Sequence, residues 1–156
     1  CHGSDARGAT GFPNLRDTDW LYGGEAETIK TTIMHGRQGM MPPWKDMLSN
    51  ADATNVVDYV LSLSGRRFDQ KAAESGKVKF EQLCIACHGA DGTGNKAMGA
   101  PNLTDGTWLY GGSKSAIRTS ILNGRNGNMP AMADFLGETR VHLLAAYIYS
   151  LSNESE

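Results

Sequence analysis

The chain has 156 residues, a length typical of a single domain, but 19 of them are glycine and only 40% are apolar. This composition predicts a loop-rich chain around a thin core. The net charge is −2 and the basic residues are scattered, which excludes a nucleic-acid-binding protein. No apolar run approaches the roughly 18 residues of a membrane-spanning helix, and nothing resembles a signal peptide. Because the chain starts at Cys1 without an initiator Met, we expect a processed or truncated product.

The sequence repeats itself with a shift of 88 residues. "FPNLRDTDWLYGG" at 12–24 matches "APNLTDGTWLYGG" at 100–112, and "GRQGMMP" at 36–42 matches "GRNGNMP" at 124–130. At the front the shift is 86, so that Cys1-His2-Gly3 matches Cys87-His88-Gly89. Two copies are too few for a solenoid. We therefore expect two small domains, 1–66 and 73–156, joined by a linker at 67–72.

The expected elements are helices and loops. In the first repeat, helices are predicted at 25–34 and around Val56–Leu63, where apolar residues recur at helical spacing. In the second repeat they are predicted from about 73 into the Cys motif, at about 113–122 and at 138–152. The Gly-rich segments between them predict loops, and no segment shows a convincing strand period. The fold class is therefore all-α, and the first domain lacks its N-terminal helix in this chain.

Cys84-Ile-Ala-Cys87-His88 is the attachment motif of a c-type haem. Its two thiols reach the two vinyl groups of one porphyrin, and the adjacent His reaches the iron. The alternatives are a zinc site, for which only His142 could complete the ligand set, and a thioredoxin-like redox pair, which needs a βαβ setting. With three cysteines in the chain, a disulfide framework is a poor explanation.

A methionine is the expected second axial ligand, because a thioether closes the iron and raises its reduction potential. Met41-Pro42 and Met129-Pro130 are related by the 88-residue shift. We therefore expect Met41 and Met129 as ligands, with Met40 the competitor in the first repeat and Met132 in the second.

Other histidines and aromatic residues have less specific roles. His35 and His142 have no histidine partner in the other repeat, and we expect them at the surface or between helices rather than on iron. The repeated aromatic residues are expected near haem, where an N–H or O–H group could donate to a propionate; they are Trp20, Trp108, Tyr22 and Tyr110. An iron closed by His and Met offers no vacant position, so the expected function is electron transfer without a catalytic site.

The Cys-x-x-Cys-His motif, the "PNLxDxxWLYGG" segments and the Gly-Arg-x-Gly-x-Met-Pro segments resemble tandem class I cytochrome c domains, and specifically the diheme subunit of cbb3-type cytochrome c oxidases. The resemblance implies two covalent haem c groups. It makes Cys84 and Cys87 the thioether residues of the second haem, with His88 and Met129 as its axial ligands. It makes Cys1, His2 and Met41 the corresponding groups of the first haem. The carbonyls of Pro13 and Pro101 would accept the ring N–H of His2 and His88.

The same resemblance implies partners and a location. The subunit would take electrons from a soluble cytochrome c or the bc1 complex and pass them through a monohaem subunit towards the catalytic subunit. Its haem domains would lie on the periplasmic side of the bacterial inner membrane, anchored by segments upstream of Cys1.

Three other functions compete with this interpretation. A soluble periplasmic diheme shuttle of the c4 kind would carry electrons freely. A diheme peroxidase or a dehydrogenase cytochrome subunit would belong to an enzyme. A haem-based gas sensor would, like a peroxidase, need an iron that can open.

Overall fold

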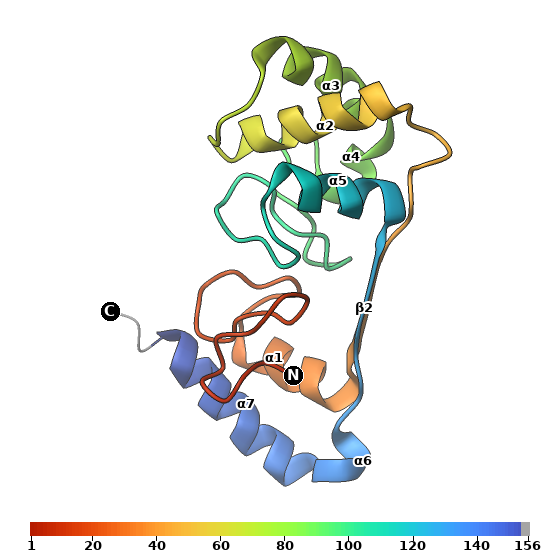
Figure 1. Ribbon diagram of the computed structural model, residues 1–156. Coiled ribbons are helices and arrows are strands. Elements are labelled where there is room, and N and C mark those ends of the chain that lie inside the picture. Colours follow the sequence, from red (N-terminus) through yellow and green to blue (C-terminus); the bar gives the residue numbers. More distant parts are fainter. Residues whose placement is uncertain (154–156) are drawn as a thin grey trace. The chain divides into compact units, whose positions relative to one another are not determined.

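The computed structural model describes residues 1–153 and divides them into two compact units (Figure 1). Unit 1 consists of residues 1–39 together with the described residues from 126 onward, and unit 2 consists of residues 40–125. Both units are helical and rich in loops, as expected. None of the helices within residues 1–153 is both long and apolar enough to cross a membrane.

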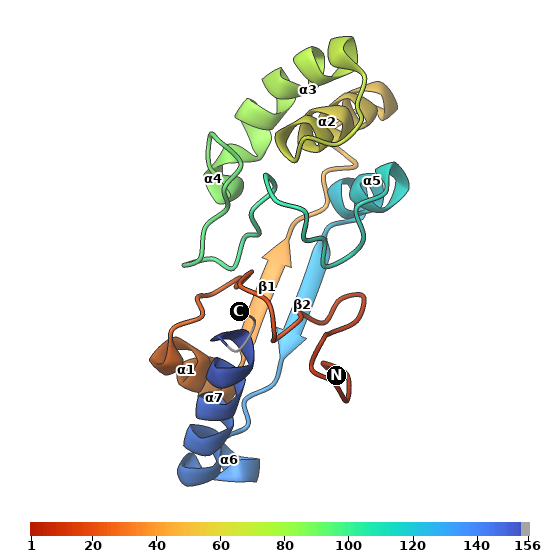
Figure 2. The same ribbon diagram turned by 90° about the vertical axis from the view of Figure 1, so that its left-hand side faces the viewer.

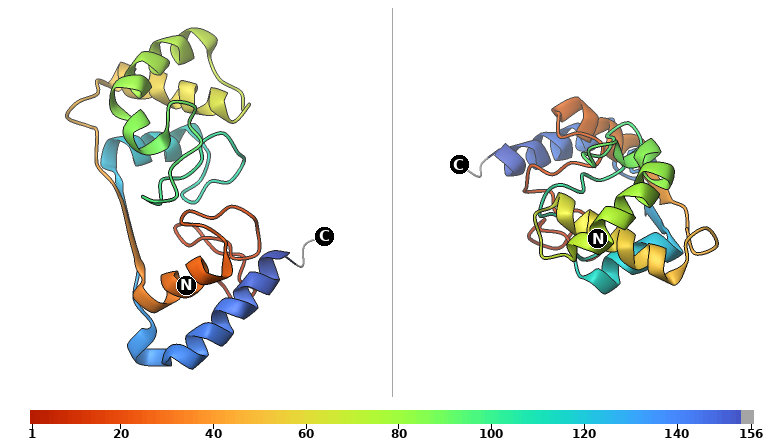
Figure 3. Two further views of the ribbon diagram at one scale, coloured as in Figure 1. Left: turned by 180° about the vertical axis from the view of Figure 1, so that it is seen from behind. Right: turned by 90° about the horizontal axis from the view of Figure 1, so that it is seen from above.

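Unit 1 is built on two helices from opposite ends of the chain. These are α1 (Ala26–His35) and α7 (Glu138–Asn153), which pack side by side (Figure 3), with the short α6 (Ala133–Leu136) next to α7. Their buried contact consists of Ile29, Ile33, Val141, Ala145 and Ile148. The remainder of unit 1 is mostly the long N-terminal loop that carries His2.

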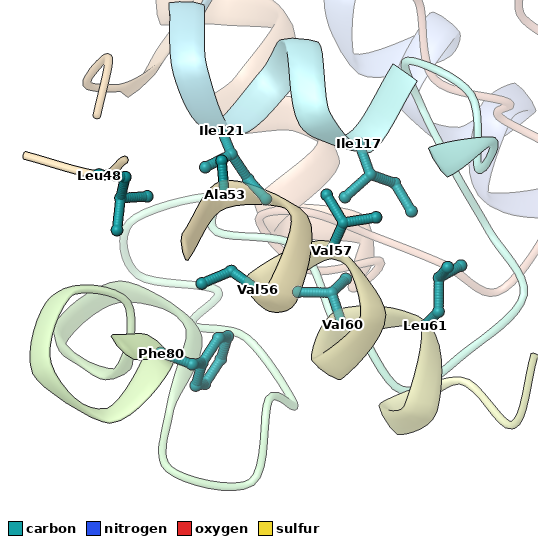
Figure 4. Close-up of a cluster of buried hydrophobic side chains, with 9 residues drawn as sticks. All are labelled: Leu48, Ala53, Val56, Val57, Val60, Leu61, Phe80, Ile117 and Ile121. Atoms are coloured by element: carbon teal, nitrogen blue, oxygen red, sulfur yellow. The ribbon is translucent and has the colours of Figure 1, made fainter. Parts of the chain in front are cut away.

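Unit 2 contains four helices. They are α2 (Asn50–Leu63), α3 (Gln70–Leu83), α4 (Ile85–His88) and α5 (Lys114–Asn123). Helix α2 packs against both α3 and α5. Its apolar face meets Phe80 of α3 and two isoleucines of α5 (Figure 4); the cluster is Leu48, Ala53, Val56, Val57, Val60, Leu61, Phe80, Ile117 and Ile121.

Two short strands occupy the Gly-Arg-x-Gly-x-Met segments, where the sequence predicted loops. Strands β1 (Arg37–Met41) and β2 (Arg125–Met129) form a two-stranded antiparallel sheet (Figure 2). Half-buried and exposed residues alternate along each strand, but glycine and polar residues hide that period from an analysis of hydrophobicity. The boundary between the two units passes through both strands.

The compact units do not follow the sequence repeats. Helix α2 belongs to the first repeat but packs in unit 2, and α7 belongs to the second repeat but packs in unit 1. The units therefore differ from the expected division into 1–66 and 73–156. The segment expected as a linker at 67–72 contains the start of α3, because the Asp69 side chain caps the helix by accepting the Ala72 N–H. Each unit thus takes its last long helix from the other repeat.

Candidate haem-binding sites

His88 is the most enclosed histidine of the two repeats' shared motifs. It ends α4, is only 8% exposed, and its Nδ1 lies 3.2 Å from the Pro101 carbonyl oxygen. A carbonyl can only accept a hydrogen bond, so Nδ1 carries the proton and Nε2 keeps its lone pair. Burial lowers the pKa of His88, partly offset by the bond to Pro101. The ring is therefore held neutral, with Nε2 available to a metal.

Cys84 and Cys87 lie at the two ends of the turn that precedes His88. Cys84 ends α3, and its backbone carbonyl accepts the N–H groups of both Cys87 and His88. Burial, with a smaller effect of Cys87, raises the pKa of the Cys84 thiol to about 11. The Cys84 thiol is therefore held in its protonated form, in which it can add to a vinyl group. Within residues 1–153, no three His, Cys, Asp or Glu side chains gather to hold a metal ion.

His2 has the same geometry in unit 1. Its Nδ1 lies 2.8 Å from the Pro13 carbonyl oxygen, so both expected His–Pro contacts are present. His2 is half-buried, and Cys1 beside it is exposed. A cavity of about 300 Å³ adjoins the ring, and its walls include Leu15, Leu144, Ile148 and Leu151. Ser4, Asp5 and Arg16 also line this cavity. A cavity with both apolar and polar walls next to an available imidazole is suited to part of a flat cofactor that has an apolar body and polar edges.

The methionines separate by burial. Met41 is half-buried against the core of unit 2, which Cys84 and Trp108 also contact, whereas Met40 is 74% exposed. Met129 and Met132 both pack on the core of unit 1. The residue that the 88-residue shift places opposite Met132 is Trp44, and both make the same backbone contact, to Ile33 and Ile121 respectively.

One glycine in each unit fixes the methionine segment by close approach. A Cβ on Gly124, which ends α5, would collide with the Met41 carbonyl oxygen and lie 2.8 Å from Pro43 N. A Cβ on Gly36, which ends α1, would collide with the Met129 carbonyl oxygen. Both glycines also have φ near +70°, a region that side chains rarely adopt. The backbone of each Met-Pro segment thus passes directly over the helix end of its own unit.

The structure therefore groups the candidate ligands differently from the expectation. Unit 2 contains His88 together with Met41, and unit 1 contains His2 together with Met129. The expectation placed His88 with Met129 and His2 with Met41, because it assumed that each repeat folds on itself. His35 and His142 are exposed on their helices, as the sequence suggested.

The four repeated aromatic residues, Trp20, Tyr22, Trp108 and Tyr110, are half-buried, and Trp108 has an unpaired donor. Trp108 Nε1 is buried without a hydrogen-bond partner. A buried unpaired N–H is costly, and it fits a site that an acidic group of a bound cofactor completes. Trp108 also contacts the core of unit 2, and Trp20 that of unit 1.

The sequence analysis missed two arginines near the repeated tyrosines, and a third, Arg66, whose guanidinium lies 5.7 Å from the centre of the Trp108 ring. The Arg37 guanidinium lies 4.6 Å from the centre of the Tyr22 ring, and that of Arg125 lies 4.3 Å from the centre of the Tyr110 ring. Each of these two arginines also donates through Nε, at 2.9 Å, to a hydroxyl of the preceding helix. Arg37 and Arg125 are related by the same 88-residue shift as Met41 and Met129, and this signal in the sequence could have identified the two arginines.

Comparison with known proteins identifies one family whose profile matches residues in both repeats. The profile of the family described as "Cytochrome C oxidase, cbb3-type, subunit III" matches residues 1–60 and 71–148. Subunit CcoP of a cbb3-type cytochrome c oxidase from Rubrivivax gelatinosus is 49% identical over 99% of this chain and 51% of its own length. Subunit FixP from Azorhizobium caulinodans is 47% identical over 97% of this chain and 55% of its own.

The chain spans about half the length of these curated relatives. The family profile covers parts of both repeats, including Cys84, Cys87 and His88. The chain therefore belongs to the family of subunit III of cbb3-type cytochrome c oxidases.

Proposed function

We propose that this chain holds two covalent haem c groups and relays electrons within a cbb3-type cytochrome c oxidase. One observation carries the proposal: the same set of groups occurs twice, once in each unit. In each, a histidine whose Nδ1–H is held by a proline carbonyl shares the unit with a half-buried Met-Pro methionine. Family membership supports the oxidase as the setting.

The proposed ligand sets follow the compact units. In unit 2, Cys84 and Cys87 form the thioethers, and His88 and Met41 are the axial ligands. In unit 1, Cys1 supplies a thioether, and His2 and Met129 are the axial ligands. Pro101 and Pro13 orient the two rings and keep the proton on Nδ1.

The chain's own residues suit electron transfer rather than bond chemistry. Bound haem supplies a one-electron centre. A histidine and a methionine of each unit would hold the iron, which would leave no free position for peroxide or oxygen. Burial of His88 would exclude water from one ligand, and Trp108 Nε1 would donate a hydrogen bond to a propionate. The protein thereby holds the centre closed and fixes its surroundings in both oxidation states.

Partners and location complete the proposal. The electron donor is a soluble cytochrome c or the bc1 complex, and the acceptors are the monohaem and catalytic subunits of the oxidase. The two units work on the periplasmic side of the bacterial inner membrane, where an anchor upstream of Cys1 holds them. In the gene, a hydrophobic span of about 20 residues upstream supports this location, whereas a cleavable signal peptide alone supports a soluble shuttle.

Spectroscopy of the reduced protein tests the closed sites. We expect low-spin His/Met spectra from both haems, unchanged by carbon monoxide. A carbon monoxide shift at either haem would instead indicate an iron that opens, as in a peroxidase or a gas sensor. In a chain starting at Cys1, mass spectrometry of haem peptides should find two thioethers at Cys84 and Cys87 and one at Cys1.

A further inference from the structure

The apolar contacts of the two units do not explain why each takes the last long helix of the other repeat. The 88-residue shift relates Ile29 and Ile33 of α1 to Ile117 and Ile121 of α5, and all four isoleucines are buried. Small and branched apolar residues of α2 and α7 pack against these isoleucines, those of α2 in unit 2 and those of α7 in unit 1. By hydrophobic burial alone, either helix fits either unit.

Asp58 is the exception to this equivalence. It lies in α2, is 2% exposed, and accepts two hydrogen bonds at Oδ1. The Asp69 N–H, at the start of α3, donates at 2.8 Å. Lys114 Nζ, at the start of α5, donates at 2.6 Å, while its side chain is 56% exposed. One buried carboxylate thus joins the starts of two helices of the second repeat to a helix of the first.

The pair of Asp58 and Lys114 exists only in the observed arrangement. The shift relates Lys114 to Ala26 at the start of α1, and Asp58 to Ala146 of α7. If α2 packed on α1 instead, its carboxylate would face an alanine, and Lys114 would face another.

The second pair of charged contacts does not discriminate. Lys30 Nζ lies 3.3 Å from Glu138 Oε1 in unit 1, and Arg118 donates to Asn50 Oδ1 at 2.6 Å in unit 2. The shift relates Lys30 to Arg118 and Asn50 to Glu138. Either arrangement therefore gives each cation a polar partner, which leaves Asp58 as the residue that distinguishes the two.

We propose that Asp58 is a positioning residue that selects the exchanged arrangement, and thereby decides which methionine shares a unit with which histidine. A buried carboxylate that loses its cation is strongly disfavoured, and such groups are best known for fixing register among equivalent packings. The proposal rests on the packing of α2 and holds whatever cofactor the units bind.

Cleavage between the repeats tests this directly in the haem-loaded protein. A protease recognition sequence inserted after Arg67, which is exposed between α2 and α3, divides the chain into its two repeats. In the exchanged arrangement each unit contains helices of both fragments, so they should co-elute after cleavage. If the repeats fold separately, the fragments should elute as two species, which would overturn the proposal for the parent protein.

Moving the cation should reverse the selection. In Lys114→Ala combined with Ala26→Lys, the cation faces α2 only if α2 packs on α1. We expect the fraction of separated fragments to rise at least about tenfold over the parent. Asp58→Asn should raise the fraction of separated fragments less than the double variant does. Lys114→Arg keeps a cation next to Asp58 and should co-elute like the parent. Ala26→Lys alone gives Asp58 a cation in either arrangement, so its separated fraction should lie between those of the parent and the double variant. The matched control is Lys30→Ala, which should co-elute like the parent.

The outcomes separate clearly. A double variant that folds with a normal haem spectrum but co-elutes like the parent contradicts the proposal, and so does an equal effect of Lys30→Ala. If Asp58→Asn does not fold, the double variant still decides the question, because it keeps both the buried carboxylate and a cation. The absorption spectrum tests the proposed haem ligation separately from the elution.

Discussion

The two units carry the same repeat-derived groups, but they differ in how much is buried of α2 and α7, the equivalent long helices of the two repeats. In unit 2, Phe80 of α3 packs edge-to-face on Tyr59 of α2 with ring centres 5.0 Å apart, and Val56 is 1% exposed. The shift relates these two α2 residues to Tyr147 and Leu144 of α7, which are 60% and 36% exposed. His88 is buried and His2 is half-buried. The better-buried helix, α2, therefore lies in the same unit as the more buried histidine, His88.

Removing the covering aromatic ring should produce the largest difference between the units. Phe80→Ala should lower the free energy of unfolding by about 3–5 kcal/mol, because Phe80 is 1% exposed and the cavity cannot close fully. Denaturant unfolding of the haem-loaded protein measures this. The control is Leu143→Ala on α7 in unit 1, which is 65% exposed and should cost below about 1 kcal/mol. Equal losses would mean that the two helices are equally covered.

The second prediction concerns the buried N–H group of Trp108 in unit 2, which has no hydrogen-bond partner in the protein. If a propionate accepts from Nε1, Trp108→Phe should destabilise the haem-loaded protein by about 1.5–3 kcal/mol, the range for a hydrogen bond to a charged group. The loss should appear in denaturant unfolding and be accompanied by a shift in the reduction potential of the haem at Cys84 and Cys87. An unchanged or more stable variant with an unchanged potential would show that Nε1 has no partner on the haem.

The close approach of α2 and α3 depends on one glycine. A Cβ on Gly76 would collide with the Asn55 carbonyl oxygen and lie 2.8 Å from Val56 N, and backbone atoms cannot move aside cheaply. Gly76→Ala should therefore lower the stability of the protein by about 1–3 kcal/mol. The control, Gly106→Ala, has nothing within 4 Å of the added Cβ and should change stability little. A neutral Gly76→Ala would show that α2 and α3 pack more loosely than described.

The N-terminal cap of α2, which α7 lacks at the equivalent position, should have the smallest effect on stability. Ser49 and Asp52 form a capping box at the start of α2, whereas the shift relates Ser49 to Gly137. Ser49→Ala should cost about 1 kcal/mol in thermal or chemical unfolding. Thr54→Ala in the same helix serves as the control, because its hydroxyl only donates to the Asn50 carbonyl. A larger effect of Thr54→Ala would contradict the capping role.

Sequence reasoning predicted the helices well because the periodicity of apolar residues is a local signal. Helices α1, α5 and α7 lie within a residue of the predicted ranges. Local signals could not assign α2 and α7 to units, since the two repeats present nearly the same apolar surfaces. They also missed β1 and β2, whose pairing joins segments 88 residues apart in sequence.

The candidate site shows the same division. The contacts of His2 with Pro13 and of His88 with Pro101 follow from loops within one repeat. Burial separates the half-buried Met41 from the exposed Met40, and the sequence does not supply burial. The grouping of Met41 with His88 depends on a helix exchange that a single buried carboxylate, Asp58, distinguishes from its alternative.

The identity of the sixth ligand at the haem of Cys84 and Cys87 is the most direct test of this account. A crystal structure of the haem-loaded protein resolves which sulfur lies opposite His88 on the iron. We predict the Sδ atom of Met41, with Met129 opposite His2. Finding Met129 opposite His88 would show that each repeat folds on itself and would contradict the account.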